Sequence, residues 1–112
     1  MRAARSVDIA LEERKVAIAE ERFWGGTCVN IGCVPKKLLV QAGEYGAWAE
    51  DAAGFGWTVP EPSFSWAKLI ASKDKEIDRL ENAYASNLEK AKVEIVRDRA
   101  VIAGANTIKL FK

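Results

Sequence analysis

Both cysteines of this 112-residue chain, Cys28 and Cys33, lie within the sequence GGTCVNIGCVPKK at residues 25–37. In a regular α-helix, residues five positions apart are separated by about 7.5 Å along the axis and point in different directions. A disulfide requires Cα atoms about 4.4–6.8 Å apart. A bridge between these cysteines therefore requires a departure from regular helix, and Gly32, which tolerates unusual backbone angles, is placed to allow it.

The residues after Cys33 favour thiolate chemistry. Pro35 suits the first turn of a helix that begins there. The N-terminus of a helix has a partial positive charge, to which Lys36 and Lys37 add full charges, so a thiolate at Cys33 would be stabilised. A bridge that closes so short a loop would stabilise the fold by only about 2 kcal/mol on the chain-entropy model. These features favour a redox-active pair over a structural link.

Two other interpretations of the cysteines stay open at this point. Cys28 and Cys33 could be two unpaired, buried thiols, or they could be half of a zinc site. The zinc interpretation is the weaker one, because the chain has no histidine and no second cysteine pair. We therefore predict no metal site.

The composition excludes several classes of function. The chain has 17 basic and 16 acidic residues and a net charge of +1, which gives no electrostatic case for binding nucleic acid or a membrane surface. No apolar run approaches the about 20 residues of a membrane span. Acidic residues follow the first arginines too soon for a targeting peptide. We expect a cytoplasmic chain of one small domain that buries about two-thirds of its unfolded surface around a real core.

Hydrophobic periodicity predicts an α/β chain that is rich in helix. The apolar run at residues 16–19 is typical of a strand covered on both faces in a parallel sheet. Residues 65–91 predict an amphipathic helix about 40 Å long, capped by Ser63 or Ser65. The other expected elements are helices over residues 1–11 and 35–51, a loop over 53–62, strands at 93–96, 100–102 and 107–110, and a hairpin turn at 103–106.

One element of a dinucleotide-binding fold is missing from this pattern. The predicted strand at residues 16–19 needs a parallel neighbour, yet no strand precedes the first predicted helix. The sequence also contains no G-x-G-x-x-G. Without that turn, no such loop presents backbone N–H groups to a pyrophosphate. By this pattern, the chain is expected to start one element too late for such a fold.

Residues 25–37 resemble the redox-centre motif of the glutathione reductase branch of the FAD-dependent pyridine nucleotide–disulfide oxidoreductases. Lys36 is similar to the lysine of glutathione and trypanothione reductases, whereas lipoamide dehydrogenases and mercuric reductases usually have serine there. The resemblance implies that residues 1–112 are part of one FAD/NAD(P)-binding domain, with no second domain. It also implies an α/β fold that is an incomplete Rossmann-like domain, helix-rich with a few short strands, in which the first strand and the glycine-rich turn are missing. The resemblance extends from about residue 15 to the C-terminus, with the matching segments in the same order as in the family. These segments include residues 16–21, 51–57, 73–77 and 79–81.

The resemblance also implies roles for the motif residues. Cys28 corresponds to the interchange thiol that attacks the substrate disulfide, and Cys33 to the charge-transfer thiol beside the flavin. Lys36 corresponds to the lysine near flavin N5, whose positive charge favours the reduced, anionic flavin. Gly26 and Thr27 correspond to motif residues on the flavin side. Without the cysteines, Lys36 would be an ordinary lysine at the start of a helix.

Two further residues correspond to binding residues of the family. Glu20 matches the acidic residue at the end of the second strand that binds the adenosine ribose hydroxyls. Tyr84 matches the tyrosine that lies against glutathione. Each also has a structural interpretation: Glu20 as a solvated carboxylate at a strand end, and Tyr84 as a core residue on the apolar stripe of its helix.

The implied activity is that of a glutathione-disulfide reductase, in which electrons pass from NADPH to FAD, to the Cys28–Cys33 disulfide and to glutathione disulfide. The parent enzyme is expected to be a homodimer. The family's NADPH domain and its interface domain, which carries a catalytic histidine and glutamate, are absent from this sequence. We therefore expect a fragment that binds FAD weakly or not at all and has no NADPH-linked activity.

The sequence leaves two alternatives open. The parent could reduce a related disulfide, of the trypanothione or dihydrolipoamide type. The chain could also be a non-enzymatic remnant or a partner-binding module, because the long helix over residues 65–91 would expose an apolar stripe without neighbours to cover it.

Overall fold

A computed structural model describes residues 15–111 of the chain. The helix expected over residues 1–11 lies outside these residues. The chain divides into two compact units, one formed by Met1–Gly26 with Leu80–Lys112 and the other by Thr27–Arg79. We call these the strand unit and the helical unit, and each is described by itself.

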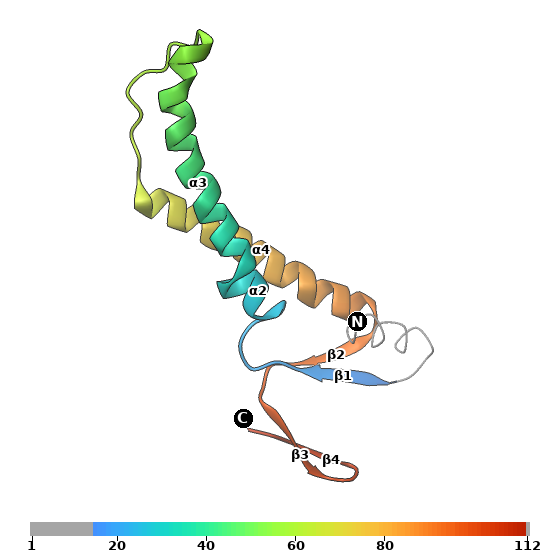
Figure 1. Cartoon of the computed structure of the whole chain (residues 1–112). Coiled ribbons are helices and arrows are strands. Elements are labelled where there is room, and N and C mark those ends of the chain that lie inside the picture. Colours follow the sequence, from blue (N-terminus) through green and yellow to red (C-terminus); the bar gives the residue numbers. More distant parts are fainter. Residues whose placement is uncertain (1–14, 112) are drawn as a thin grey trace. The chain divides into compact units, whose positions relative to one another are not determined.

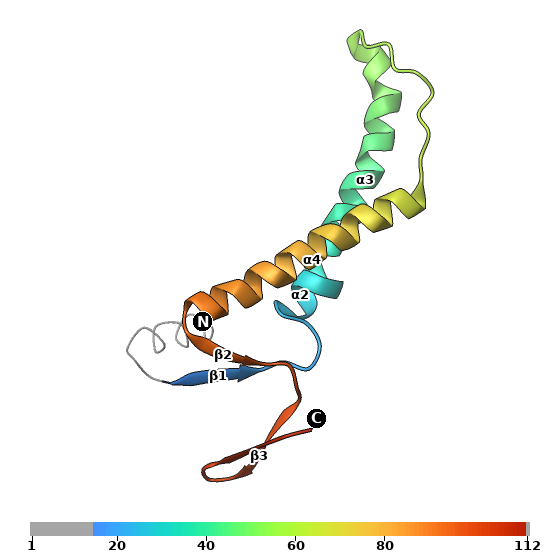
Figure 2. The same ribbon diagram turned by 180° about the vertical axis from the view of Figure 1, so that it is seen from behind.

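The strand unit contains a parallel pair of short strands. β1 (Val16–Ala19) pairs with β2 (Val93–Val96), with Val16 opposite Val93. The two strands lie side by side in both views (Figures 1 and 2). The backbone N–H of Glu20 continues the pairing by donating to the Val96 carbonyl over 3.0 Å. The parallel neighbour that β1 requires is therefore the strand predicted at residues 93–96.

The expected burial of β1 on both faces is wrong for the residues described. Ile18 is 40% exposed, and Ala17 and Ala19 are exposed as well. A pair of four-residue strands is too narrow to carry helices on both of its faces, which is what buries the strands of a complete parallel sheet. The apolar composition of residues 16–19 thus correctly predicted a parallel strand. The prediction that other elements cover both of its faces was wrong.

The predicted hairpin forms at the end of the chain. β3 (Ala100–Gly104) and β4 (Thr107–Leu110) pair antiparallel, with an irregularity in register between Ile102 and Gly104. Every residue of both strands is exposed. Isolated two-stranded hairpins are marginally stable in water, so this element adds little to the stability of the strand unit.

The helical unit contains two predicted helices, the second only as far as Arg79, and one helix that was not predicted. α3 (Cys33–Asp51) begins two residues before Pro35, which lies in its first turn. A short 3-10 turn (Ala52–Phe55) follows α3. The helix α2 (Gly26–Ile31), which starts on the last residue of the strand unit, was missed because six residues are too few for helical periodicity to be visible.

The helix α4 (Trp66–Lys90) confirms the long amphipathic stretch. Ser65 caps it, since its hydroxyl accepts a hydrogen bond from the Lys68 backbone N–H over 3.3 Å. On its exposed face, the Arg79 guanidinium donates two hydrogen bonds of 2.7 and 2.8 Å to Glu76 and holds the pKa of that carboxyl below its ordinary value of 4.5. No helix among residues 15–111 is long and apolar enough to cross a membrane.

The expectation of a substantial core is wrong for the residues described. Buried apolar side chains are few: Trp24 and Val93 in the strand unit, and Val29 and Ile77 in the helical unit. Short sheets and long helices have a large surface for their volume, so a chain of this length need not bury its apolar residues. The packing of Trp24 is therefore important for its unit, as discussed below.

The end of α4 offers a test of backbone conformation. Lys92 has φ 58°, in the left-handed region, and its N–H donates to the Glu89 carbonyl over 2.9 Å. Because a side chain is disfavoured there and glycine is not, Lys92→Gly should raise the free energy of unfolding by about 0.5–1 kcal/mol, measured by urea denaturation. The control, Lys75→Gly in the interior of α4, should lower it by about 1 kcal/mol. A loss of stability in Lys92→Gly similar to that of the control would contradict the prediction.

Candidate redox site

Cys28 and Cys33 form a disulfide with a Cα–Cα distance of 4.7 Å. Cys28 lies in α2 and Cys33 is the first residue of α3, with Gly32 between the two helices. This confirms that a bridge requires a break in the helix at this position. Both cysteines are exposed, so the interpretation as unpaired buried thiols is wrong. No group of three or more His, Cys, Asp or Glu side chains that could hold a metal ion occurs among residues 15–111.

Gly32 lies against the backbone of the helix that contains Cys28. A Cβ atom at this position would be 3.0 Å from the Thr27 carbonyl oxygen and 3.1 Å from the Cys28 Cα. The Gly32 carbonyl in turn accepts a hydrogen bond from the Lys36 backbone N–H over 3.1 Å, which closes the first turn of α3. The absence of a side chain at Gly32 therefore permits the close approach of the two cysteine-bearing segments.

The surroundings of Cys33 are electropositive. Cys33 lies at the N-terminus of a 19-residue helix with no acidic residue in its first turn, and Lys36 and Lys37 follow three and four positions later. Both lysines are exposed, whereas Pro35 is buried. The helix terminus and the lysine charges act together to favour a thiolate at Cys33 whenever the bridge is reduced.

The predicted site residues are divided between the two units. Thr27, Cys28, Cys33 and Lys36 belong to the helical unit, while Glu20, Gly26 and Tyr84 belong to the strand unit. The structure therefore brings the disulfide together with Thr27 and Lys36. The cofactor and substrate roles of all these residues stay predictions.

Each of the strand-unit residues has a defined local environment. Glu20 follows β1 directly, is half-buried, and its Oε1 accepts a hydrogen bond from the Arg22 backbone N–H over 2.7 Å. Gly26 donates its backbone N–H to the Phe23 carbonyl over 3.1 Å. Tyr84 is 47% exposed on α4, so its interpretation as a core residue is wrong.

A cluster around Trp24 holds the segment that precedes the redox motif. The Trp24 side chain is 2% exposed, and its backbone N–H donates to Glu81 Oε1 over 3.3 Å. The same oxygen accepts a hydrogen bond from Arg97 Nη1 over 3.4 Å, and the Arg97 guanidinium lies 5.6 Å from the centre of the Trp24 ring. We name these three residues the Trp24 cluster. Sequence reasoning missed it, because no spacing pattern pairs Trp24 with a residue of α4 and with Arg97, which follows β2.

The redox motif begins with a tight turn that includes Trp24 and the two glycines Gly25 and Gly26. Trp24 and Gly25 are the central residues of a turn closed by the hydrogen bond from Gly26 to Phe23, and Gly25 has φ 93°. A positive φ at the second central position is typical of a type II turn, which favours glycine there. Gly26, with φ 69°, then starts α2. The positive φ angles of Gly25 and Gly26 therefore explain why glycine is favoured at both positions where the chain enters α2.

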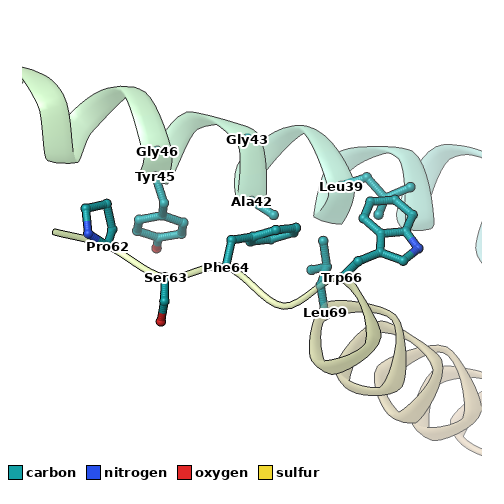
Figure 3. A pocket seen from close by; sticks show the side chains of 10 residues that line it. All are labelled: Leu39, Ala42, Gly43, Tyr45, Gly46, Pro62, Ser63, Phe64, Trp66 and Leu69. Atoms are coloured by element: carbon teal, nitrogen blue, oxygen red, sulfur yellow. The ribbon is translucent and has the colours of Figure 1, made fainter.

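The helical unit also contains an apolar cavity of about 470 Å³ away from the cysteines. Figure 3 shows side chains of α3, such as Leu39 and Tyr45, facing Phe64 in the segment before α4 and Trp66 at the start of α4. No charged residue lines the cavity. Its lining contains no cysteine, so the disulfide remains the candidate redox site.

Comparison with solved structures indicates the class of protein whose fold this chain shares. The chain matches a solved structure of the HOCl-induced flavoprotein disulfide reductase RclA from Escherichia coli, in its Cu(II) complex, with a TM-score of 0.68 and 23% identity over 93% of this chain and 21% of that one. The fold is therefore that of part of a flavoprotein disulfide reductase. No protein-family model matches the sequence.

Sequence similarity narrows this class. The chain is 60% identical over 94 residues to glutathione reductase from Burkholderia cepacia and 48% identical over 96 residues to glutathione reductase from a Nostoc species. These matches cover 84% and 86% of this chain. The chain is therefore a homologue of part of the glutathione reductases, and it spans 21% of the length of these relatives.

Proposed function

We propose that the chain supplies the redox-active disulfide of a glutathione-disulfide reductase. The observation that carries the proposal is the exposed Cys28–Cys33 bridge at the electropositive N-terminus of α3. The 60% identity to a glutathione reductase supports glutathione disulfide as the substrate. The parent enzyme is proposed to be a cytoplasmic homodimer that uses FAD and NADPH.

The dithiol form can perform the transfer in two exchange steps. The Cys28 thiolate attacks one sulfur of glutathione disulfide, which forms a mixed disulfide and releases one glutathione thiolate. The Cys33 thiolate then attacks the Cys28 sulfur, which restores the bridge and releases the second glutathione. Two electrons pass from the dithiol to the substrate, and the protons of the two cysteine thiols end on the two glutathione thiols. The α3 terminus and Lys36 assist by increasing the thiolate fraction of Cys33.

The chain has a residue suited to bind the adenosine end of FAD. Glu20 lies at the carboxyl end of a parallel strand, where a carboxylate can accept hydrogen bonds from ribose hydroxyls. The Arg22 backbone N–H donates a hydrogen bond to Oε1 of Glu20, which orients the carboxylate. The sequence has no G-x-G-x-x-G to hold the pyrophosphate, so we expect weak FAD binding by these 112 residues. When bound, FAD would supply the two electrons, taken from NADPH, that reduce the bridge again.

A single-turnover experiment tests the proposal. The chain is reduced with dithiothreitol, freed of the reductant without oxygen, and mixed with glutathione disulfide. We expect two glutathione thiols released for each chain and the loss of both protein thiols, with no consumption of NADPH when it is added. Disulfides of trypanothione and lipoamide, tested in parallel, should react more slowly. Failure to release glutathione would overturn the proposed function, whereas NADPH consumption with a flavin absorption band would overturn the expected inactivity of the chain alone.

A further inference from the structure

We propose that Gly32 is a positioning residue for the redox step, because its lack of a side chain selectively stabilises the bridged form of Cys28 and Cys33. The proposal rests on the proposed function, in which this bridge opens and closes. It adds a residue that determines how easily the bridge is reduced.

The contacts around Gly32 leave no room for a methyl group. A Cβ there would have as its nearest atoms the Thr27 carbonyl oxygen at 3.0 Å, the Cys28 Cα at 3.1 Å and the Thr27 carbonyl carbon at 3.4 Å. All three are backbone atoms, which cannot rotate away as the end of a flexible side chain could. To accept alanine, the α2 backbone and Gly32 must move apart by a few tenths of an ångström.

The bridge opposes this movement. It holds the Cα atoms of Cys28 and Cys33 at 4.7 Å, and Gly32 is the residue directly before Cys33. Residues five positions apart in a regular helix are about 7.5 Å apart along the axis, so the bridged segment is shorter than a relaxed one. In the dithiol form this restraint is absent and the two segments can separate. A methyl group at Gly32 should therefore raise the free energy of the bridged form more than that of the dithiol.

Two glycines in α3 provide matched controls. A Cβ at Gly43 or at Gly46 would have no neighbouring atom within 4 Å. Alanine at either position should favour the helix in both redox states, since it has a higher helix propensity than glycine. Gly43→Ala should therefore change the stability of the chain without changing the equilibrium between bridge and dithiol.

The experiment measures that equilibrium in dithiothreitol buffers. Dithiothreitol gives two electrons and two protons to the bridge and becomes a cyclic disulfide, and the fraction of dithiol protein is read by alkylation and mass spectrometry. We expect Gly32→Ala to lower the equilibrium constant for the bridge about tenfold, which corresponds to about 30 mV for a two-electron couple. Gly43→Ala should stay within about twofold of the unchanged chain. An unchanged equilibrium for Gly32→Ala would overturn the proposal.

A thermodynamic cycle separates positioning from a general loss of folding. In a chain with both cysteines replaced by serine, Gly32→Ala should have little effect on urea unfolding, because the restraint is gone. If alanine destabilises the chain without cysteines as much as the bridged chain, Gly32 is a structural residue only and the proposal fails. The dithiothreitol readout does not depend on glutathione, so a chain that fails to reduce glutathione disulfide would leave this test intact.

Discussion

Replacing Trp24 by alanine is expected to lower the free energy of unfolding of the strand unit by about 3–5 kcal/mol, the range measured for buried aromatic side chains. Trp24 is 2% exposed, and Val93 is the only other apolar side chain classed as buried among the described residues of that unit. Alanine would remove the ring that lies beneath Arg97 and leave a cavity in a unit with little other packing. Because whole domains are stable by only about 5–15 kcal/mol, a loss of this size should unfold much of the unit.

Hydrogen exchange measures this effect where it occurs. The amides of β1 and β2 should lose protection in Trp24→Ala, while those of the middle of α3 should keep theirs. The matched control is Trp57→Ala, since Trp57 is 71% exposed and its removal should cost little. Equal losses of protection in the two variants would show that the Trp24 cluster does not stabilise the strand unit.

Replacing Cys33 by serine is expected to stop the exchange reaction after its first step. Cys28 can still attack glutathione disulfide, but no second thiol remains to release the bound glutathione. The variant should therefore release one glutathione for each chain and keep one glutathionyl group on Cys28, as measured by mass spectrometry. It should also lose about 2 kcal/mol of stability, since the unfolded chain is no longer restrained by the bridge.

The exchange prediction has two controls of its own. The double variant, with serine at both Cys28 and Cys33, should release no glutathione and bind none. Dithiothreitol added to the trapped Cys33→Ser protein should restore one free thiol. Release of two glutathione molecules by Cys33→Ser would be incompatible with a mechanism that uses both cysteines.

Much of the fold could be predicted because its signals are local. The apolar run of β1, the long periodicity of α4 and the glycine turn between β3 and β4 each indicated their element at nearly the observed bounds. The helix break at Gly32 followed from the reach of a disulfide. The short α2 was not predictable by the same means, because helical periodicity needs more residues than α2 contains.

Properties that depend on distant residues could not be predicted. Burial of β1 depends on what covers the sheet, and its two four-residue strands leave Ile18 exposed. The hydrogen bond between Trp24 and Glu81 joins residues 57 positions apart, and neither the spacing nor the composition of these segments predicts it. For the candidate site, the cysteine pair and its lysines were identifiable from adjacent residues. The close approach at Gly32 required coordinates, because it depends on the positions of Thr27 and Cys28 backbone atoms.

The pairing of β1 with β2 has a consequence for the order in which the chain folds. Val16 pairs with Val93, so the whole of Thr27–Arg79 lies in the loop that this pairing closes. Closing so long a loop costs more entropy than forming local helices, and contacts between distant residues slow folding. By contrast, the segment from Cys28 to Cys33 closes over five positions. We therefore expect the redox pair to assemble early, and the strand pairing that places Glu20 at the end of β1 to form late and slowly.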